Sequence, residues 1–415
     1  MEGFPGSIIM IMLAIMYKNF GVSNADITLY TGALVLPWVL KPLWASLIDV
    51  VMTPRRWIYS MEILIGMLLI AMAMSLSSSY FFIFTLVIAW LIAFLSSSHD
   101  IAADGFYISS LAPEQQSFFV GLQSAAYNVG KISATGFIVM LCGVLYYQSN
   151  SYFFSWHICL LICGAVSILF GMYHKVVLPK AEFKRSTSVK QAVSNFVDVY
   201  KSFFQIDNLW VGLLFILFFK FSESMVGAIL PLFLVGSIEH GGLGLSNTFT
   251  GFAYGTVAPL AIILGGILGG YCLYRKGFAS MIYILYIVIN LPHIFYILLA
   301  VFHVDNHILV LLSIAIEQFS FSVGLSAYIL FTYFMVKDSK YKTAHYAFFT
   351  GAVLLAKMIP VMISGLLQEY VGYAWFFTIV LVVAIPVIPI LKRVKKVAGD
   401  YGKTKDQKLD ISGDK

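Results

Sequence analysis

The stretch KVVLPKAEFKRSTSVKQAVSNFVDVYKSFFQID, residues 175–207, is the longest polar break in an otherwise apolar chain. It is rich in lysine, and residues 188–205 place apolar side chains at helical spacing. That pattern predicts an amphipathic helix lying on a membrane surface. The break separates two long apolar parts, residues 1–174 and 208–393, and a short basic tail follows at 394–415.

The two apolar parts consist of long hydrophobic runs. Hydrophobic residues make up 60% of the chain and charged residues only 11%, against about a quarter charged in ordinary soluble proteins. A membrane-spanning helix needs about 20 mostly apolar residues. Runs of this length lie at 4–20, 27–48, 57–76, 79–104, 117–146, 151–174, 208–236, 247–273, 278–301, 307–335, 343–368 and 371–391. The sequence therefore predicts an all-α membrane protein with twelve transmembrane helices.

The positions of the basic residues predict the orientation. Most of the 26 lysines and arginines fall in the linker, in the tail and in loops on the same side of the predicted helices. Basic residues favour the cytoplasmic side, so both termini are expected in the cytoplasm. This topology explains the net charge of +6 without a nucleic-acid partner. We expect the protein to be a monomer embedded in the lipid bilayer.

The two apolar parts of the chain share similar features at matching positions. Tyr30–Gly32 opens the second run and Phe249–Gly251 opens the eighth, and a basic pair ends each run after a similar distance. Lys131 and Lys357 lie at matching depths of the fifth and eleventh runs. Twelve helices in two pseudo-symmetric six-helix bundles, joined by a basic linker, are typical of the major facilitator architecture.

Lys131 and Lys357 are the first candidate site residues. A charge inside a membrane costs several kcal/mol unless it is paired or faces water. The two lysines could face each other across a central cavity and bind an anionic ligand. Alternatively, each could pair with a buried acid and only hold helices together.

Further charged residues inside the predicted helices include Lys220, Glu223, Glu317 and Glu62. Lys220 and Glu223 are three residues apart, a spacing that permits an ion pair on one helix face. They form either a neutralised pair or a functional one, in which both are candidates for proton coupling. Glu317 lies near mid-membrane, where a lone carboxyl could carry a proton or accept a hydrogen bond from a nearby Tyr or Ser. Glu62 is expected to reach toward the membrane surface or to pair with a base there.

The segment SSSHDIAADGFY, residues 96–107, ends the fourth run with one histidine and two acids. Asp100 and Asp104 share one helix face because they are four residues apart. His99 with Asp104 has the spacing of an acyltransferase motif, but two positions five residues apart point to different faces. A metal site is a second hypothesis. The third is a gate in which these acids pair with bases of the opposite half, and Arg55 and Arg56 belong to the same candidate gate.

The segments LKPLWASLID (40–49) and DIAADGFYISSLAPEQQ (100–116) resemble the second and fourth helices of AmpG-type muropeptide permeases, a major facilitator family. The segment EQFSFSVGLSAYILFTYFM (317–335) agrees with this resemblance, and the eukaryotic acetyl-CoA transporters are distantly similar in the same places. The resemblance implies gating or coupling roles for Lys41, Asp49, Asp100 and Asp104, which carry the family pattern.

The resemblance also implies a function. It implies import of N-acetylglucosaminyl-1,6-anhydro-N-acetylmuramic acid, with or without its peptide, across the bacterial inner membrane. This import would be driven by the proton gradient and need no cofactor. Such an anionic glycopeptide suits Lys131 and Lys357, and Trp38 and Tyr127 are candidates for stacking on its sugars. Another organic anion or acetyl-CoA would suit the same lysines. A membrane-embedded acyl or glycosyl transferase and a non-transporting receptor are the alternatives from other classes.

Overall fold

The structure is a computed structural model that describes residues 3–44, 48, 52–110, 126–179, 200–304, 306–339 and 342–403. Within these residues, nine helical segments are long and apolar enough to cross a membrane. They are Pro54–Ser75, Phe81–Phe106, Ala126–Ser149, Tyr152–Val177, Leu209–Val235, Asn247–Lys276, Phe278–Phe302, His307–Val336 and Phe348–Ala398. The predicted amphipathic helix of the linker falls mainly on residues 180–199, outside the described residues.

The first and second predicted spans are helices divided into shorter pieces. The first consists of α1 (Gly3–Ser7), η1 (Ile8–Met12) and α2 (Leu13–Asn19), and the second of α3 (Asn24–Ala33), α4 (Leu36–Leu40) and η2 (Lys41–Leu43). Pro37 and Pro42 lie in the second span, where the missing backbone N–H and the ring interrupt a regular helix. The eleventh and twelfth spans are joined as α19 (Lys342–Val383), which breaks at Gly372 with φ of 77°. The twelve-helix prediction is confirmed.

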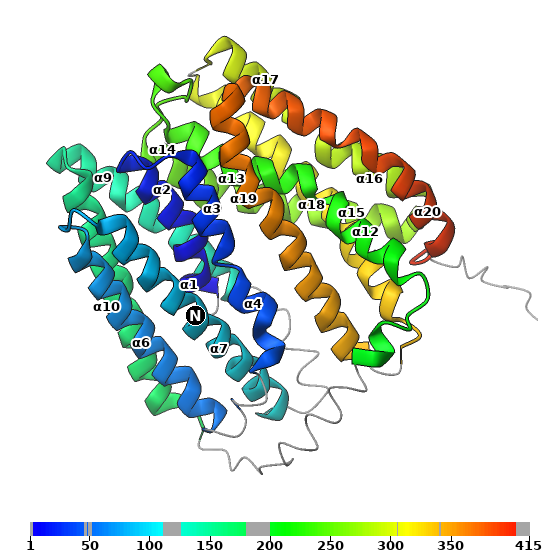
Figure 1. The fold of residues 1–415 in the computed structure, drawn as a ribbon, viewed down its shortest axis with the longest axis horizontal. Helices are drawn as coiled ribbons and strands as arrows, with labels where there is room; N and C mark the ends of the chain where they lie inside the picture. Colours follow the sequence, from blue (N-terminus) through cyan, green and yellow to red (C-terminus); the bar gives the residue numbers. More distant parts are fainter. Residues whose placement is uncertain are drawn as a thin grey trace, which may run out of the picture.

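Figure 1 shows the two halves side by side, with α6 (Pro54–Ser75), α7 (Phe81–Ser110) and α10 (Tyr152–Val177) in one and α15–α20 in the other. The other helices of the first half include η3 (Ser133–Ile138) and α9 (Val139–Ser149). The second half comprises α12 (Leu209–Phe219), α13 (Phe221–Val235), α14 (Asn247–Phe252), η5 (Ala253–Val257), α15 (Ala258–Lys276), α16 (Phe278–Asn290), α17 (His293–Phe302) and α18 (His307–Val336).

The helix irregularities gather in spans that meet between the halves. The π-helical turns η1, η3 and η5 interrupt spans one, five and eight, and span seven breaks at Lys220 between α12 and α13. Short π-helical turns inside α-helices frequently mark functional sites because they redirect side chains and free backbone groups.

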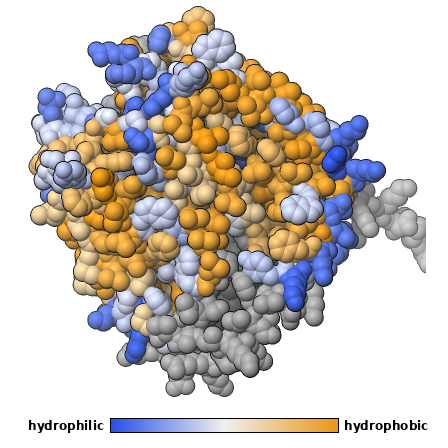
Figure 2. Space-filling view, in the orientation of Figure 1, coloured by the Kyte–Doolittle hydropathy of each residue, from blue (hydrophilic) through white to orange (hydrophobic). Residues whose placement is uncertain are grey.

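The flank of the molecule is apolar. Figure 2 shows hydrophobic residues over most of the visible surface and hydrophilic residues gathered toward its ends. Large apolar side chains such as Phe84, Leu91 and Ile267 are exposed, which suits contact with lipid tails. We call the end that carries Arg55, Arg56, Arg275, Lys276 and Lys337 the basic end.

The chain continues past the last span as α20 (Ile388–Ala398), preceded by the short turn η6 (Ile385–Val387). The predicted boundary between the C-terminal bundle and the tail, at residue 393, lies inside this helix. Leu391, Val394 and Ala398 are buried against the bundle, and their spacing places them on one face. The backbone N–H of Ala279 then donates to the carbonyl of Gly399 at 2.9 Å. The start of the tail is therefore part of the packed structure.

Candidate functional site

A cavity of about 400 Å³ lies between the two halves. Both halves contribute to its wall, and its charged and aromatic lining residues are Trp38, Asp100, Tyr127, Lys131, Glu223 and Lys357. Volumes of this size are typical of small-molecule sites. The lining brings together residues that are more than 300 positions apart in the chain, which only the contact between the two bundles can do.

Lys131 and Lys357 are the two cations of the cavity wall without an acidic partner. Among the described residues, neither ammonium makes an ion pair or a side-chain hydrogen bond. Lys357 is exposed and Lys131 is partly exposed, although both lie inside membrane-spanning segments. The two charges interact with each other and with Lys220 and Glu223. This geometry favours the anion-binding hypothesis over the hypothesis of helix-pinning ion pairs.

The two acids of the wall are neutralised within their own halves. Lys220 Nζ lies 3.5 Å from Glu223 Oε2, and the same ammonium lies 4.6 Å from the ring centroid of Phe321. Lys220 can reach both groups because the chain turns at this residue between α12 and α13. The predicted i, i+3 pair is therefore formed, and it leaves Lys131 and Lys357 without a counterion.

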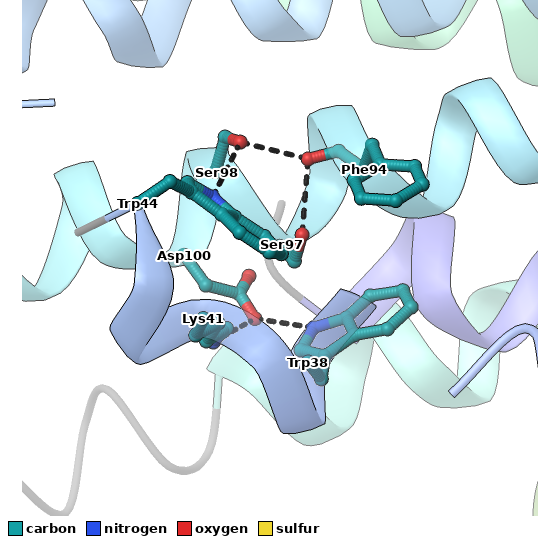
Figure 3. Close-up of polar contacts among 7 residues, drawn as sticks. All are labelled: Trp38, Lys41, Trp44, Phe94, Ser97, Ser98 and Asp100. Carbon is teal, nitrogen blue, oxygen red and sulfur yellow. Dashed lines mark hydrogen bonds and ion pairs between the residues drawn. The ribbon is translucent and has the colours of Figure 1, made fainter. Parts of the chain in front are cut away.

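Asp100 is held by the first half, as Figure 3 shows. Its Oδ2 accepts hydrogen bonds from Trp38 Nε1 at 2.7 Å and from Lys41 Nζ at 2.8 Å. Its Oδ1 is buried without a hydrogen-bond partner. In this conformation the ion pair of Asp100 therefore lies within one half, and the pair across the halves that the gate hypothesis requires is not made by Asp100.

Three other candidate gate residues, Asp104, Arg55 and Arg56, lie near the basic end. Asp104 is exposed one turn beyond Asp100 on α7, and Arg56 is exposed at the start of α6. The guanidinium of Arg55 donates to the backbone carbonyl of Lys175 in the same half. Asp49 lies outside the described residues.

At the end opposite the basic end, a layer of hydrogen bonds joins the two halves; we call it the cross-half layer. Asn24 Nδ2 donates to Gln368 Oε1 at 2.5 Å and to the Tyr373 hydroxyl at 2.8 Å. Asn247 Nδ2 donates to Asn19 Oδ1 at 2.6 Å. Sequence analysis missed these residues because neutral amides near a helix end carry no signal of an unusual cost.

Backbone donors and one further charge complete the cross-half layer. The backbone N–H of Ala25 donates to Glu369 Oε1 at 2.9 Å, and that of Gly365 donates to Thr28 Oγ1 at 3.0 Å. Lys18 Nζ donates to Asn24 Oδ1 at 2.6 Å and so orients the amide that crosses the interface. Thr28 also lines the cavity, together with Trp38 and Asp100, which lie farther along their helices toward the basic end. The cavity therefore lies on the basic-end side of this layer.

A close contact between two glycines also joins the halves, between spans five and eight. A side chain at Gly136 in η3 would collide with the backbone of Gly255 in η5. Small residues allow this close backbone approach between membrane helices. Both π-helical turns therefore lie in the contact between the halves.

Glu317 lies outside the set of residues that line the cavity. Its side chain is buried and accepts hydrogen bonds from Tyr296 at 3.3 Å and from Gln318 at 2.7 Å. This placement agrees with the hydrogen-bonded alternative, a partner for a nearby tyrosine.

The histidine of the SSSHDIAADGFY segment has another partner. His99 is buried, and its Nε2 lies 3.1 Å from Glu62 Oε1. Buried in this way, it has no open position from which to deprotonate a hydroxyl group, so the geometry gives no support to the acyltransferase hypothesis. Within the described residues, no group of three His, Cys, Asp or Glu is arranged to hold a metal ion.

Comparison with known proteins shows which family has this architecture. A family profile described as the Major Facilitator Superfamily matches residues 1–357. The chain is 27% identical over 411 residues to putative transporter AmpG 4 of Rickettsia conorii (strain ATCC VR-613 / Malish 7), covering 94% of this chain and 93% of that protein. It is 22% identical over 360 residues to the anhydromuropeptide permease of Escherichia coli (strain K12), covering 85% of this chain and 70% of that protein.

The fold has a close counterpart among solved structures. A bacterial homologue of the human lysosomal transporter Spinster, in an inward-facing and unoccupied conformation, superposes with a TM-score of 0.71 at 14% identity, covering 96% of this chain and 94% of that one. The family profile, the twelve helices and the cavity between the two halves all support the same fold and family. The chain is a multi-pass membrane transporter that belongs to the Major Facilitator Superfamily.

Proposed function

We propose that this transporter imports anhydro-muropeptides, fragments of peptidoglycan, into the bacterial cytoplasm by proton symport. One observation carries the proposal. Lys131 from the first half and Lys357 from the second line the same cavity, and neither forms an ion pair with a carboxylate of the described residues. The carboxylates of a muropeptide would supply the missing negative charges. The name of one relative, the anhydromuropeptide permease of Escherichia coli (strain K12), points to the same cargo.

The aromatic part of the wall suits the sugar part of this cargo. Trp38 is fixed because its indole N–H donates to Asp100, and Tyr127 is exposed where it lines the same cavity. Aromatic rings offer flat apolar faces with a polar edge, which match the face of a pyranose ring. Together, the two lysines and the two aromatic rings of this wall would bind the charged part and the sugar part of an anionic saccharide.

The arrangement of closed and open regions supports alternating access. With the basic end in the cytoplasm, the cross-half layer closes the outer side, and the cavity is on the inner side. Return to the outward-open state requires that the hydrogen bonds of the cross-half layer break and that the two halves close together at the basic end. Asp49, Asp100, Asp104, Lys41, Arg55 and Arg56 are our candidates for the inner gate.

Uptake into liposomes tests the proposal. The reconstituted protein would receive radiolabelled N-acetylglucosaminyl-1,6-anhydro-N-acetylmuramic acid, with and without an imposed proton gradient. We expect gradient-driven accumulation that Lys131→Ala and Lys357→Ala each reduce by about 10- to 100-fold, the value of a lost charge-assisted hydrogen bond of ~1.5–3 kcal/mol. Lys392→Ala, which removes an exposed lysine of α20, is the control and should transport normally.

Two alternatives make different predictions in the same assay. If the cargo is another organic anion, acetyl-CoA among them, that anion rather than the anhydro-disaccharide will compete and accumulate, and the two lysine variants will still fail. If the protein is a transferase, the label will appear inside as a chemically altered product. Mass spectrometry of the vesicle contents separates transport of unchanged cargo from group transfer.

A further inference from the structure

A buried cluster of three titratable side chains lies in the first half, away from the residues that line the cavity. Glu62 of α6 accepts at both carboxylate oxygens: its Oε1 lies 3.1 Å from His99 Nε2 and its Oε2 lies 2.7 Å from His174 Nδ1. His99 belongs to α7 and His174 to α10. The cluster therefore connects three membrane-spanning helices through one carboxylate.

The cluster is isolated from other charges. Among the described residues, Glu62 interacts electrostatically with His99 and His174 only. The neighbouring groups on the packed helices have other partners: Asp100 binds Lys41 and Trp38, Arg55 binds the carbonyl of Lys175 and lies 6.0 Å from the ring of Tyr59, and the ring of Tyr173 lies beside His174. Asp104, one turn farther along α7, is exposed.

This isolation determines how many protons the cluster holds. With an ionised Glu62 and two neutral imidazoles, each donating an N–H to its own oxygen, the cluster carries one uncompensated negative charge. A buried charge of this kind is costly. One additional proton makes one imidazole cationic, or the carboxyl neutral, and removes the net charge without breaking the three-residue contact. The cluster is thus built to gain and lose one proton.

The exposure of the three side chains shows where that proton exchanges. The His174 side chain is 23% exposed, whereas those of His99 and Glu62 are 6% and 2% exposed. His174 lies in the last turn of α10 beside Lys175, at the basic end. The inner member, His99, directly precedes Asp100, which lines the cavity on α7. Water thus reaches one side of the cluster, and α7 links the other side to the cavity wall.

We propose that Glu62, His99 and His174 form a proton-binding site that exchanges one proton with the water at the basic end. The assignment of this proton to transport rests on the proposed function as a proton symporter. Loss of the proton leaves Glu62 with an unbalanced charge between α6, α7 and α10. The position of α7, and with it Asp100, therefore depends on the protonation of the cluster.

Infrared difference spectroscopy of the full chain in lipid nanodiscs, with no cargo present, tests the site. As the pH is stepped from about 8 to about 5, the range in which histidine titrates, we expect carboxylate and imidazole bands to change. Glu62→Gln should abolish this coupled change, and Glu239→Gln, at an exposed carboxyl outside the spans, should leave it intact. A spectrum of Glu62→Gln that equals that of the wild type overturns the proposal.

His174→Gln provides a second variant at the more exposed member, in case Glu62→Gln does not fold. It should also lose the coupled change, and an unchanged titration would overturn the site. In liposomes, Glu62→Gln should lose gradient-driven accumulation of the anhydro-disaccharide but retain its equilibrium exchange. Equal losses of both would show a structural role only. A wild-type protein that titrates but transports no anhydro-disaccharide would refute the proposed cargo and leave the proton site standing.

Discussion

Lys41 and Asp100 form an ion pair of 2.8 Å between Nζ and Oδ2, across neighbouring spans of the same half. Both side chains are partly buried, with 24% and 15% exposure. The same Asp100 oxygen fixes Trp38, a residue of the cavity wall. One carboxylate oxygen therefore links a candidate gate residue to a candidate binding residue.

A double-substitution cycle tests this link. We expect Lys41→Met and Asp100→Asn each to lower the initial uptake rate about tenfold, the effect of ~1.4 kcal/mol, because each leaves the other group without its counterion. The double variant should be no slower than either single one, since contacting residues do not act additively. Rates that multiply in the double variant would show that the two residues act independently.

The cross-half layer leads to a prediction about conformation. Asn24→Ala removes two hydrogen bonds across the halves, to Gln368 and Tyr373. At about 0.5–1.5 kcal/mol for each bond, the loss should shift the equilibrium between closed and open outer sides by about tenfold. Spin labels at Tyr147 and Tyr370, which are 92% and 90% exposed, report the separation of the halves at that end.

Electron–electron distance measurements on this labelled pair should show a longer component that grows in Asn24→Ala. The labelled protein would carry Cys272→Ser, because Cys272 is the partly exposed member of the four cysteines. Ser78→Ala, at the same end but without a bond across the halves, is the matched control. An unchanged distance distribution in Asn24→Ala would show that the layer does not hold the outer side closed.

Gly136 gives a steric version of the same test. Gly136→Ala adds a methyl group that meets the Gly255 backbone, and overpacking of this kind typically costs about 1–3 kcal/mol. We expect slower uptake and a wider outer separation of the spin labels. Gly270→Ala on α15 has open space around the added methyl group and should behave as the wild type. Equal behaviour of the two variants would refute a role for the glycine contact.

Much of the fold was predictable from sequence because the bilayer imposes one length on every apolar run. The charged residues of the cavity were found for a related reason. Lys131 and Lys357 are costly in lipid, so their presence indicated a water-filled site, and the structure places both on the cavity wall. The Lys220–Glu223 pair followed from helical spacing alone.

The features that sequence reasoning missed depend on contacts between distant segments. Asn24 meets Gln368 only because the halves pack together, and neither amide is unusual near a helix end. Glu62 was expected to pair with a base, yet its spacing from His99 and His174 carries no periodic signal across three separate helices. For Glu317 the sequence indicated its depth in the membrane, and the structure adds that it lies outside the cavity lining.

The two predicted coupling acids can now be separated by their positions. Glu223 lines the cavity beside Lys220, so its charge state acts directly on Lys131 and Lys357. Glu317 is buried between Tyr296 and Gln318. We therefore expect Glu223→Gln to abolish proton-driven accumulation while equilibrium exchange of cargo continues, because exchange needs no net proton movement. Glu317→Gln keeps an acceptor for Tyr296 and should retain both activities. Both modes would be measured in the same liposomes. Accumulation that survives in Glu223→Gln and fails in Glu317→Gln would show that Glu317, and not Glu223, is the acid that couples cargo movement to the proton gradient.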